Sequence, residues 1–148
     1  MRYDGSHGQE PVERDRRVVG HAIVIEAVIE PAPSEPVVLA TQPADKGIAL
    51  TIHLPRSLAY FRGHFPSFAV LPGVVQVDWA MLLARRYLAV RRGAARAMRV
   101  KFARPIRPDA ELTLTVDYDR AERLLHFEYR DRDYLYSSGR IELEDHDI

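Results

Sequence analysis

The stretch VVQVDWAMLLARRYLAVRR, residues 74–92, constrains the fold of this chain more than any other. It follows Pro72-Gly73 and contains no internal glycine or proline, so its length and composition predict one long helix. Apolar residues cover every side of its first turns, which is typical of a helix that is buried all round. We therefore expect a single helix enclosed by the rest of the chain, with Asp78 inside its apolar part.

Runs rich in β-branched and aromatic residues predict strands on both sides of this helix. The predicted strands are residues 18–29, 37–41 and 48–53 before the helix, and 98–102, 111–118, 124–129 and 135–143 after it. Short polar turns separate the later strands, so they should form an antiparallel meander. One buried helix followed by such a meander indicates the α+β fold class.

The first 36 residues differ from the rest of the chain. Residues 1–17 are polar and of mixed charge, which predicts a loose arm, and PAPSEP at residues 31–36 predicts a stiff connector. We therefore divide the chain into an N-terminal arm with a proline-rich connector, residues 1–36, and one domain, residues 37–148. A chain of 148 residues is long enough for one domain with its own core.

The composition excludes several classes of protein. The chain has no cysteine, so disulfides, thiol nucleophiles and cysteine-bound metals are excluded, and its six histidines are scattered singly. Charged residues interrupt the long apolar stretches, so none is a clean membrane span of roughly 20 residues. The first residues lack the basic head and apolar core of a signal peptide. We expect a cytoplasmic protein with no bound metal and no membrane span.

The net charge of zero conceals an uneven distribution of charge. Residues 85–107 carry nine basic side chains and no acidic one, whereas residues 109–148 carry twelve acidic and five basic ones. This asymmetry favours an acidic partner, a nucleic acid or two solvated faces. Binding to nucleic acid is disfavoured, because no aromatic residues interleave with the arginines and no known nucleic-acid motif surrounds them.

The segment FRGHFPSFAVLPGVVQVDW, residues 61–79, contains the side chains that are the strongest candidates for a chemical role. His64 lies between Gly63 and Phe65, and Asp78 follows within the apolar helix. A buried, unpaired carboxylate costs much free energy, so Asp78 should be paired, hydrogen-bonded, protonated or open to a cavity. Taken singly, the histidine and the aspartate are each better explained by a structural role than by a catalytic one.

Taken together, these residues resemble the motif of the β-hydroxyacyl-acyl carrier protein dehydratases, the FabA/FabZ type of hot-dog-fold enzyme. That family has a G-H-F-P loop and a P-G-V turn, then an acid on the central helix fourteen residues after the histidine, as from His64 to Asp78. A weaker similarity continues through KFARPIRPDAELTL and YLYSSGRIEL, so that it covers roughly residues 37–144. The sequence VVQVDWA looks most like the ApeI-like dehydratases associated with aryl polyene lipid clusters.

The resemblance implies a hot-dog fold, in which an antiparallel sheet wraps around one long central helix. It implies dehydration of a 3-hydroxyacyl-acyl carrier protein to the trans-2-enoyl thioester, in fatty acid or aryl polyene type lipid biosynthesis, without a cofactor. Neutral His64 would take the proton from C2, and Asp78 would hold or protonate the departing hydroxyl. To donate a proton near neutral pH, the Asp78 carboxyl would have to be buried among apolar neighbours, namely Val75, Trp79 and Leu82.

The rest of the site also follows from the resemblance. The backbone N–H of Gly73, at the start of the helix, would bind the thioester carbonyl. In the family, the two catalytic residues come from opposite subunits, so a homodimer or an assembly of dimers would pair His64 of one chain with Asp78 of the other. The acyl tunnel would be lined by Phe61, Phe65, Val74, Val75 and Trp79. The acyl carrier protein would dock on the basic run, at Arg85, Arg86, Arg91, Arg92 and Arg96.

The sequence departs from the family pattern at three positions. Asp78 is the acid of the FabA type, whereas the FabZ type has glutamate, so it is open whether isomerisation follows dehydration. Ser67 and Ala69 replace a glycine and a proline of the loop.

Two other functions are compatible with this fold. A hot-dog acyl thioesterase would share the fold and hydrolyse the thioester, and a non-catalytic acyl-binding protein would lack the histidine and the acid. The G-H-F-P loop and its spacing favour the dehydratase.

Overall fold

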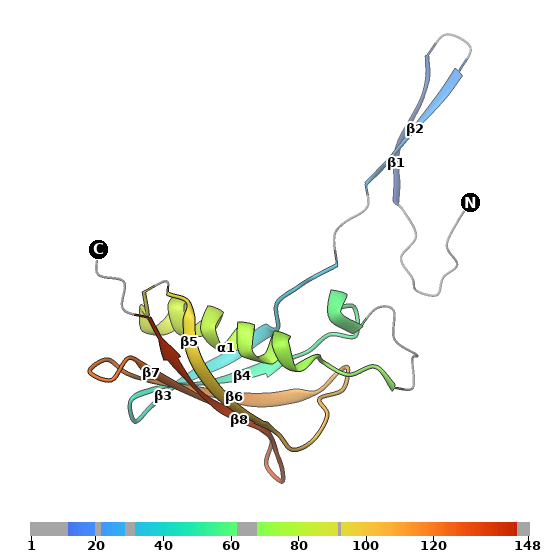
Figure 1. The fold of residues 1–148 in the computed structure, drawn as a ribbon. Coiled ribbons are helices and arrows are strands. Elements are labelled where there is room, and N and C mark those ends of the chain that lie inside the picture. The colour runs from blue at the N-terminus through green and yellow to red at the C-terminus, as the bar shows by residue number, and fades with distance from the viewer. Residues whose placement is uncertain (1–11, 20–21, 29–31, 62–67, 92, 145–148) are drawn as a thin grey trace. The chain divides into compact units, whose positions relative to one another are not determined.

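The computed structural model describes residues 12–19, 22–28, 32–61, 68–91 and 93–144, and these divide into two compact units (Figure 1). The first unit, Met1–Ala32, contains an antiparallel hairpin of β1 (Val12–Val19) and β2 (Ala22–Val28). The prediction of one strand over residues 18–29 is therefore wrong, and the predicted loose arm is wrong from residue 12 onward, while residues 1–11 lie outside the described residues. Val19 pairs with Ala22, so what reads as one long apolar stretch is divided between two short antiparallel strands.

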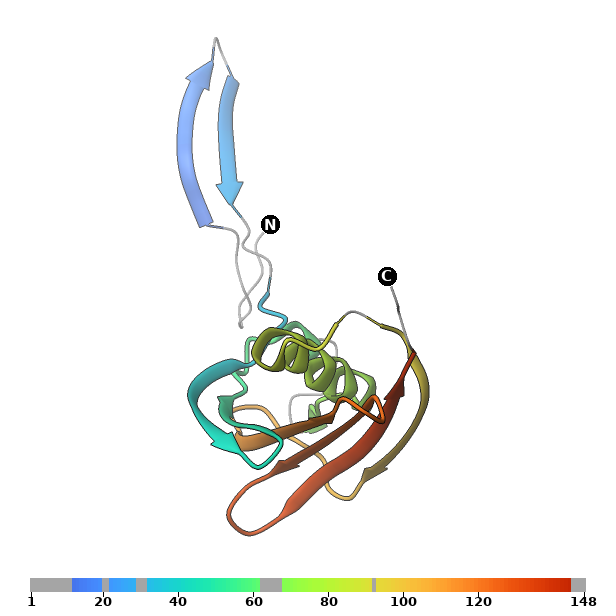
Figure 2. The same cartoon turned by 90° about the vertical axis from the view of Figure 1, so that its left-hand side faces the viewer.

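The second unit, Pro33–Ile148, consists of a six-stranded antiparallel sheet and one long helix on its inner face (Figures 1 and 2). The strand order is β3-β4-β6-β7-β8-β5, so β3 and β5 form the two edges. The α+β prediction is confirmed, and each strand predicted in this part of the chain forms. The strands are β3 (Val37–Ala44), β4 (Gly47–His53), β5 (Ala95–Phe102), β6 (Glu111–Asp119), β7 (Leu124–Arg130) and β8 (Leu135–Leu143).

The core lies between the sheet and the helix. Side chains alternate between the two faces of a strand, and every second residue of the central strands is apolar and buried. The buried residues of β6 and β7 are Leu112, Leu114, Val116, Leu125, Phe127 and Tyr129. They pack with helix residues such as Val75 and Leu83 into one cluster.

The helix α1 (Gly73–Leu88) begins directly after Pro72, whose extended backbone (φ −61°, ψ 146°) suits the residue that precedes a helix. It ends four residues earlier than the predicted stretch. Ala89 adopts the left-handed conformation (φ 55°), and the Arg120 guanidinium donates a hydrogen bond to the Leu88 carbonyl at 2.6 Å. Val90 then turns back into the core, where it is buried, so tertiary packing ends a helix that composition alone would extend.

The sheet curls around α1 but leaves one side of the helix uncovered (Figure 2). Val75, Trp79 and Leu83 are buried, whereas Val74 is 68% exposed and Asp78 is also exposed. The prediction of a helix buried all round is therefore wrong for the single chain. The sheet ends at β5, and no further element in the described part of this unit covers that side of the helix.

Gly139 of β8 allows β7 and β8 to pack closely, and it provides a test of this core. A Cβ atom at Gly139 would lie 2.6 Å from Phe127 Cε2 and 3.1 Å from Val100 Cγ2. Phe127 is buried, so it cannot move without disturbing its neighbours. We expect Gly139→Ala to lower the free energy of unfolding by roughly 1–3 kcal/mol, as measured by chemical denaturation.

The substitution Gly73→Ala is a matched control for this experiment. A Cβ atom at Gly73 would lie 2.6 Å from Phe102 Cζ, but the Phe102 side chain is half exposed and can rotate aside. The loss of stability should therefore be clearly smaller than at Gly139. Equal losses for the two variants, or none for Gly139→Ala, would contradict this account of the core.

Candidate active site

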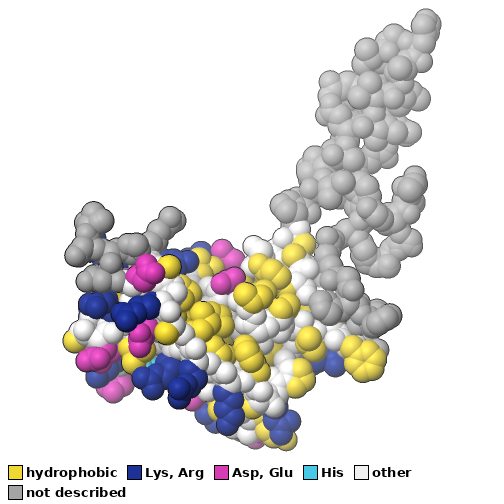
Figure 3. Space-filling model, viewed as in Figure 1, with side chains coloured by type: hydrophobic (Ala, Val, Ile, Leu, Met, Phe, Trp, Pro, Cys, Tyr) yellow, Lys and Arg dark blue, Asp and Glu magenta, His cyan; other side chains and the backbone are white. Residues whose placement is uncertain are grey.

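A groove of about 570 Å³ runs between the uncovered side of α1 and the edge strand β5. Hydrophobic side chains gather over this part of the surface (Figure 3). The lining residues are Gly73, Val74, Val77, Asp78 and Met81 from the helix, and Ala95, Met98, Val100 and Phe102 from the strand. Asp78 supplies the one ionisable side chain among these lining residues, so the groove places a carboxylate in apolar surroundings.

This groove results from two residue spacings, one of four residues along the helix and one of two residues along β5. Val74 and Asp78 are four residues apart, as are Val77 and Met81, and such pairs lie on the same side of a helix. On β5, every second residue from position 98 to position 102 is apolar and points to the helix side of the sheet. The groove therefore follows from the local patterns of two segments that the strand order brings side by side.

Asp78 lies open to the groove. Among the described residues, no hydrogen-bond or ion-pair partner contacts the Asp78 side chain. The carboxylate is instead open to a cavity, which is one of the alternatives expected from the sequence. The expectation that Val75 and Trp79 bury Asp78 is wrong for the single chain, because these two side chains face the core. Burial of the carboxyl group would require something else to cover the groove.

The N-terminus of α1 lies at one end of the groove. The Pro72 carbonyl accepts hydrogen bonds from the amides of Val75 (3.1 Å) and Gln76 (3.2 Å), and Pro72 has no side chain that could cap the helix. The ring of Phe102 lies against Gly73, so a larger residue would fit there only if this half-exposed ring rotated aside. The positive end of the helix dipole, with the backbone of Gly73, thus lies beside the carboxylate-bearing helix side.

The predicted site residues fall into three groups. His64, Phe65 and Arg92 lie outside the described residues, so the separation of His64 and Asp78 stays a prediction. The structure brings Gly73, Val74 and Asp78 together in the groove. The other predicted tunnel residues, Phe61, Val75 and Trp79, are buried in the core instead.

Trp79 has a structural partner on the core side of the helix. Its indole Nε1 donates a hydrogen bond to the Ser34 carbonyl at 3.1 Å, and its ring meets Tyr60 edge to face at 6.2 Å between centroids. These contacts hold the start of this unit against α1. In the single chain Trp79 therefore anchors residues before β3, and it does not line the groove.

Sequence reasoning missed the strand side of the groove, above all Met98, Val100 and Phe102. The signal was present, because Arg99 and Lys101 alternate with these apolar residues along one predicted strand. What the sequence could not supply was the place of β5 in the sheet. Its position at the edge, next to the open side of α1, depends on pairing with β8.

The predicted docking arginines differ in their surroundings. Arg86 forms two hydrogen bonds with the Glu35 carboxylate, at 3.0 and 3.3 Å, and these together with the negative charge raise its pKa. Arg96 Nε lies 4.0 Å from Glu142 Oε1, and the two side chains form an exposed ion pair. Arg85 is half-buried and Arg91 exposed, and neither forms an ion pair with another described residue. Acidic neighbours thus partly neutralise the basic run.

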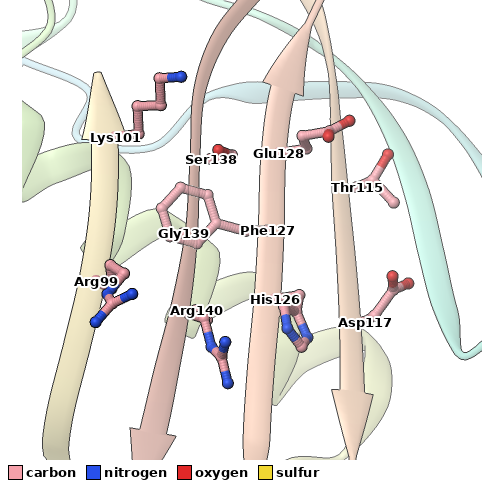
Figure 4. Close-up of a pocket in the computed structure, with 10 residues that line it drawn as sticks. All are labelled: Arg99, Lys101, Thr115, Asp117, His126, Phe127, Glu128, Ser138, Gly139 and Arg140. Carbon is pink, nitrogen blue, oxygen red and sulfur yellow. The ribbon is translucent and has the colours of Figure 1, made fainter. Parts of the chain in front are cut away.

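A second hollow, of about 400 Å³, lies on the outer face of the sheet (Figure 4). Arg99, Arg140, His126 and Asp117 follow one another across neighbouring strands at its centre. Arg99, Arg140 and His126 are exposed there, whereas Asp117 is half-buried and its Oδ1 has no hydrogen-bond partner among the described residues. None of the predicted catalytic residues is among the lining residues. This hollow has a polar, mostly exposed lining without any of the predicted catalytic residues, and the groove between α1 and β5 is the candidate active site.

The described part of the chain shows neither a metal-binding cluster nor a membrane-spanning helix. Within it, no group of three or more histidine, aspartate or glutamate side chains is arranged to hold a metal ion. No helix there has the length and apolar composition needed to cross a membrane.

Two solved structures are similar to this chain in both sequence and fold. The dehydratase heterocomplex ApeI:P from Xenorhabdus doucetiae contains a chain with 34% identity and a TM-score of 0.67, and the match covers 75% of this chain and 99% of that one. A protein from Erwinia carotovora subsp. atroseptica described as uncharacterized has 30% identity and a TM-score of 0.61, and the match covers 74% of this chain and 95% of that one. Among curated proteins, no sequence matches significantly.

Thioesterase superfamily member 2 from Mus musculus shares the fold alone. Its identity is 13% and its TM-score 0.50, over 70% of this chain and 80% of that chain. The hot-dog fold predicted from the sequence is thereby confirmed, since dehydratases and thioesterases with this fold match the same sheet and helix. The fold by itself does not separate the two activities.

The family comparison is more specific than the fold. The model of a family described as ApeI-like, ApeI dehydratase, matches residues 40–140, which include α1, the groove and both predicted catalytic positions. This span exceeds half of the sequence. The chain therefore belongs to the family of ApeI-like dehydratases.

Proposed function

We propose that this chain dehydrates a 3-hydroxyacyl thioester on an acyl carrier protein to the trans-2-enoyl thioester, in fatty acid or aryl polyene type lipid biosynthesis. The observation that carries the proposal is the position of Asp78, a carboxylate in an apolar groove beside the N-terminus of α1. Membership in the ApeI-like dehydratase family supports the reaction class. No metal or organic cofactor is required for this step.

The proposed chemistry uses three groups of the protein. His64 in its neutral form removes a proton from C2, and the thioester oxygen, which gains negative charge, accepts a hydrogen bond from the Gly73 amide. The C2–C3 double bond forms as the C3–O bond breaks, and the Asp78 carboxyl protonates the departing hydroxyl to give water. Exchange with solvent then returns a proton to Asp78 and removes one from His64.

A second copy of the chain would complete this site. Val74, Met98 and Phe102 are all at least half exposed along the groove, and the edge strand β5 offers an unpaired row of backbone groups. A partner on this side would bury the Asp78 carboxyl, favour its protonated form and supply His64 from the other subunit. We therefore propose a homodimer, although the similar ApeI:P structure is described as a heterocomplex.

The first functional test removes the two catalytic groups separately. We expect His64→Ala and Asp78→Asn each to slow dehydration by about 10²–10⁴-fold, because each removes an acid or base from the transition state. Asp78 forms no described side-chain hydrogen bond or ion pair, so Asp78→Asn should leave the protein folded, as checked by its melting temperature. The products are identified by mass spectrometry, which separates loss of water from hydrolysis of the thioester.

Two control variants carry the same changes elsewhere. His126 lies on the outer face of the sheet, and Asp45 lies in the turn after β3. We expect the variants His126→Ala and Asp45→Asn to dehydrate the substrate at the wild-type rate. Normal turnover in His64→Ala or Asp78→Asn would refute the proposed chemistry. Release of free acid by the wild-type protein, without enoyl thioester, would instead identify a thioesterase.

A subunit-mixing experiment tests the shared site. Inactive His64→Ala and Asp78→Asn chains, carrying different tags, are co-expressed, and the mixed dimer is isolated by both tags. One of its two sites would contain both native groups, so we expect about half of the wild-type activity per dimer. If purified mixed dimers stay inactive, each chain builds its own site, and if no dimer forms, a different partner must cover the groove.

Docking of the carrier protein is tested by reversing one exposed charge of the basic run. We expect Arg91→Glu to raise KM for the carrier-bound substrate by up to about tenfold and to leave a short pantetheine thioester unaffected. High salt should reduce the difference between variant and wild type. Arg132→Glu, in the turn between β7 and β8, is the control with the same change in charge. Equal losses on both substrates would show that Arg91 supports the fold or the site.

A further inference from the structure

Gln76 is buried in the middle of an apolar interface. In the described part of the chain, the buried polar side chains are Gln76 and Ser137, at 3% and 0% exposure. Ser137 Oγ on β8 donates a hydrogen bond of 2.6 Å to Gln76 Oε1 on α1. The two polar groups therefore satisfy each other across the contact between helix and sheet.

The other end of the Gln76 amide holds the segment that leads into the helix. Gln76 Nε2 donates a hydrogen bond of 3.1 Å to the Leu71 carbonyl, and the Leu71 amide donates one of 2.8 Å to the Ile106 carbonyl. A backbone carbonyl can only accept, so the orientation of the Gln76 amide group is fixed. Residues 68–72 follow directly on the segment that contains His64, so this bond ties the end of that loop to α1.

A third hydrogen bond fixes the helix backbone at the same residue. The Tyr129 hydroxyl on β7 donates a hydrogen bond of 2.7 Å to the Gln76 carbonyl. Burial, and secondly the nearby charge of Asp78, raise the pKa of Tyr129 well above its ordinary value. The phenol therefore stays protonated and remains a donor at any pH at which the enzyme works.

This arrangement has a cost that an apolar side chain would not incur. Buried polar groups stabilise a core only when every partner is present, and a leucine or methionine would pack against β7 and β8 without that requirement. The bonds of Gln76 join Leu71, β7 and β8 at a single point, two residues before the groove-facing Asp78. Gln76 points to the sheet and Asp78 to the open side, so rotation of α1 would displace both groups together.

We propose that Gln76 is a positioning residue for the dehydration, an inference that rests on the proposed function. Its amide holds the segment that leads to Gly73 at a fixed distance from the helix side that carries Asp78. Ser137 and Tyr129 fix its orientation from the sheet. A displacement of about 1 Å at a catalytic group can reduce a rate by roughly 10²-fold, so loss of this anchor should act mainly on kcat.

The test uses variants that separate hydrogen bonding from shape. Gln76→Met keeps the length of the side chain and removes both hydrogen bonds. Ser137→Thr and Ser137→Val add the same volume at a fully buried site, but threonine alone keeps the hydroxyl group. For Gln76→Met we expect kcat to fall by about 10- to 100-fold with KM within about threefold of wild type. Ser137→Val should lose clearly more activity than Ser137→Thr.

Amide hydrogen exchange gives a second readout that does not depend on activity. In Gln76→Met, the amide of Leu71, which donates to the Ile106 carbonyl, should exchange about tenfold faster or more, whereas the amide of Leu114 in the centre of β6 should not change. A normal kcat together with unchanged exchange at Leu71 would overturn the proposal. Equal losses of kcat in Ser137→Thr and Ser137→Val, in proportion to their losses in melting temperature, would show that the network only stabilises the core.

These outcomes stay distinct from failure of the proposed function. If wild-type protein forms no enoyl thioester from any 3-hydroxyacyl thioester, the proposed reaction is wrong. Faster exchange at Leu71 in Gln76→Met would then still show that Gln76 anchors the loop, and unchanged exchange would refute the anchor as well. If wild-type protein is active and Gln76→Met is equally active, the reaction stands and the positioning role is wrong.

Discussion

The structure depends on the packing of one helix against the inner face of a single curled sheet that is too narrow to enclose it. Strands β4, β6, β7 and β8 pack against one side of α1, and the sheet ends at β5. The same contact that builds the core therefore leaves a row of apolar side chains and one carboxylate uncovered. Stability and reactivity are located on opposite sides of the same helix.

This division explains why the residues of the helix have different roles although they share one apolar pattern. Trp79 and Val75 face the sheet and hold the core, whereas Val74 and Asp78, displaced around the helix axis, face the groove. Gln76 joins the two sides because its hydrogen bonds fix the helix to β8 and to the entering loop. A small rotation of the helix would alter the core and the site together.

The sequence predicted the helix, the six strands of the main sheet and their antiparallel pairing, because each has a clear local pattern. It failed where long-range packing decides: the left-handed Ala89 ends the helix, and the place of β5 at the sheet edge opens one side of α1. Asp78 was singled out because its motif, with His64 fourteen residues earlier, resembles that of the dehydratases, but its exposure could not be predicted. Met98 and Phe102 were not recognised, since a strand pattern does not reveal which element lies beside it.

The central claim is that the groove beside Asp78 converts a 3-hydroxyacyl thioester into an enoyl thioester. The most direct measurement is mass spectrometry of a 3-hydroxyacyl-acyl carrier protein after incubation with the wild-type protein. The account predicts a carrier-bound product that is lighter by one water and absorbs as an α,β-unsaturated thioester. An unchanged substrate across a series of chain lengths, or carrier protein released together with a free hydroxy acid, would contradict it.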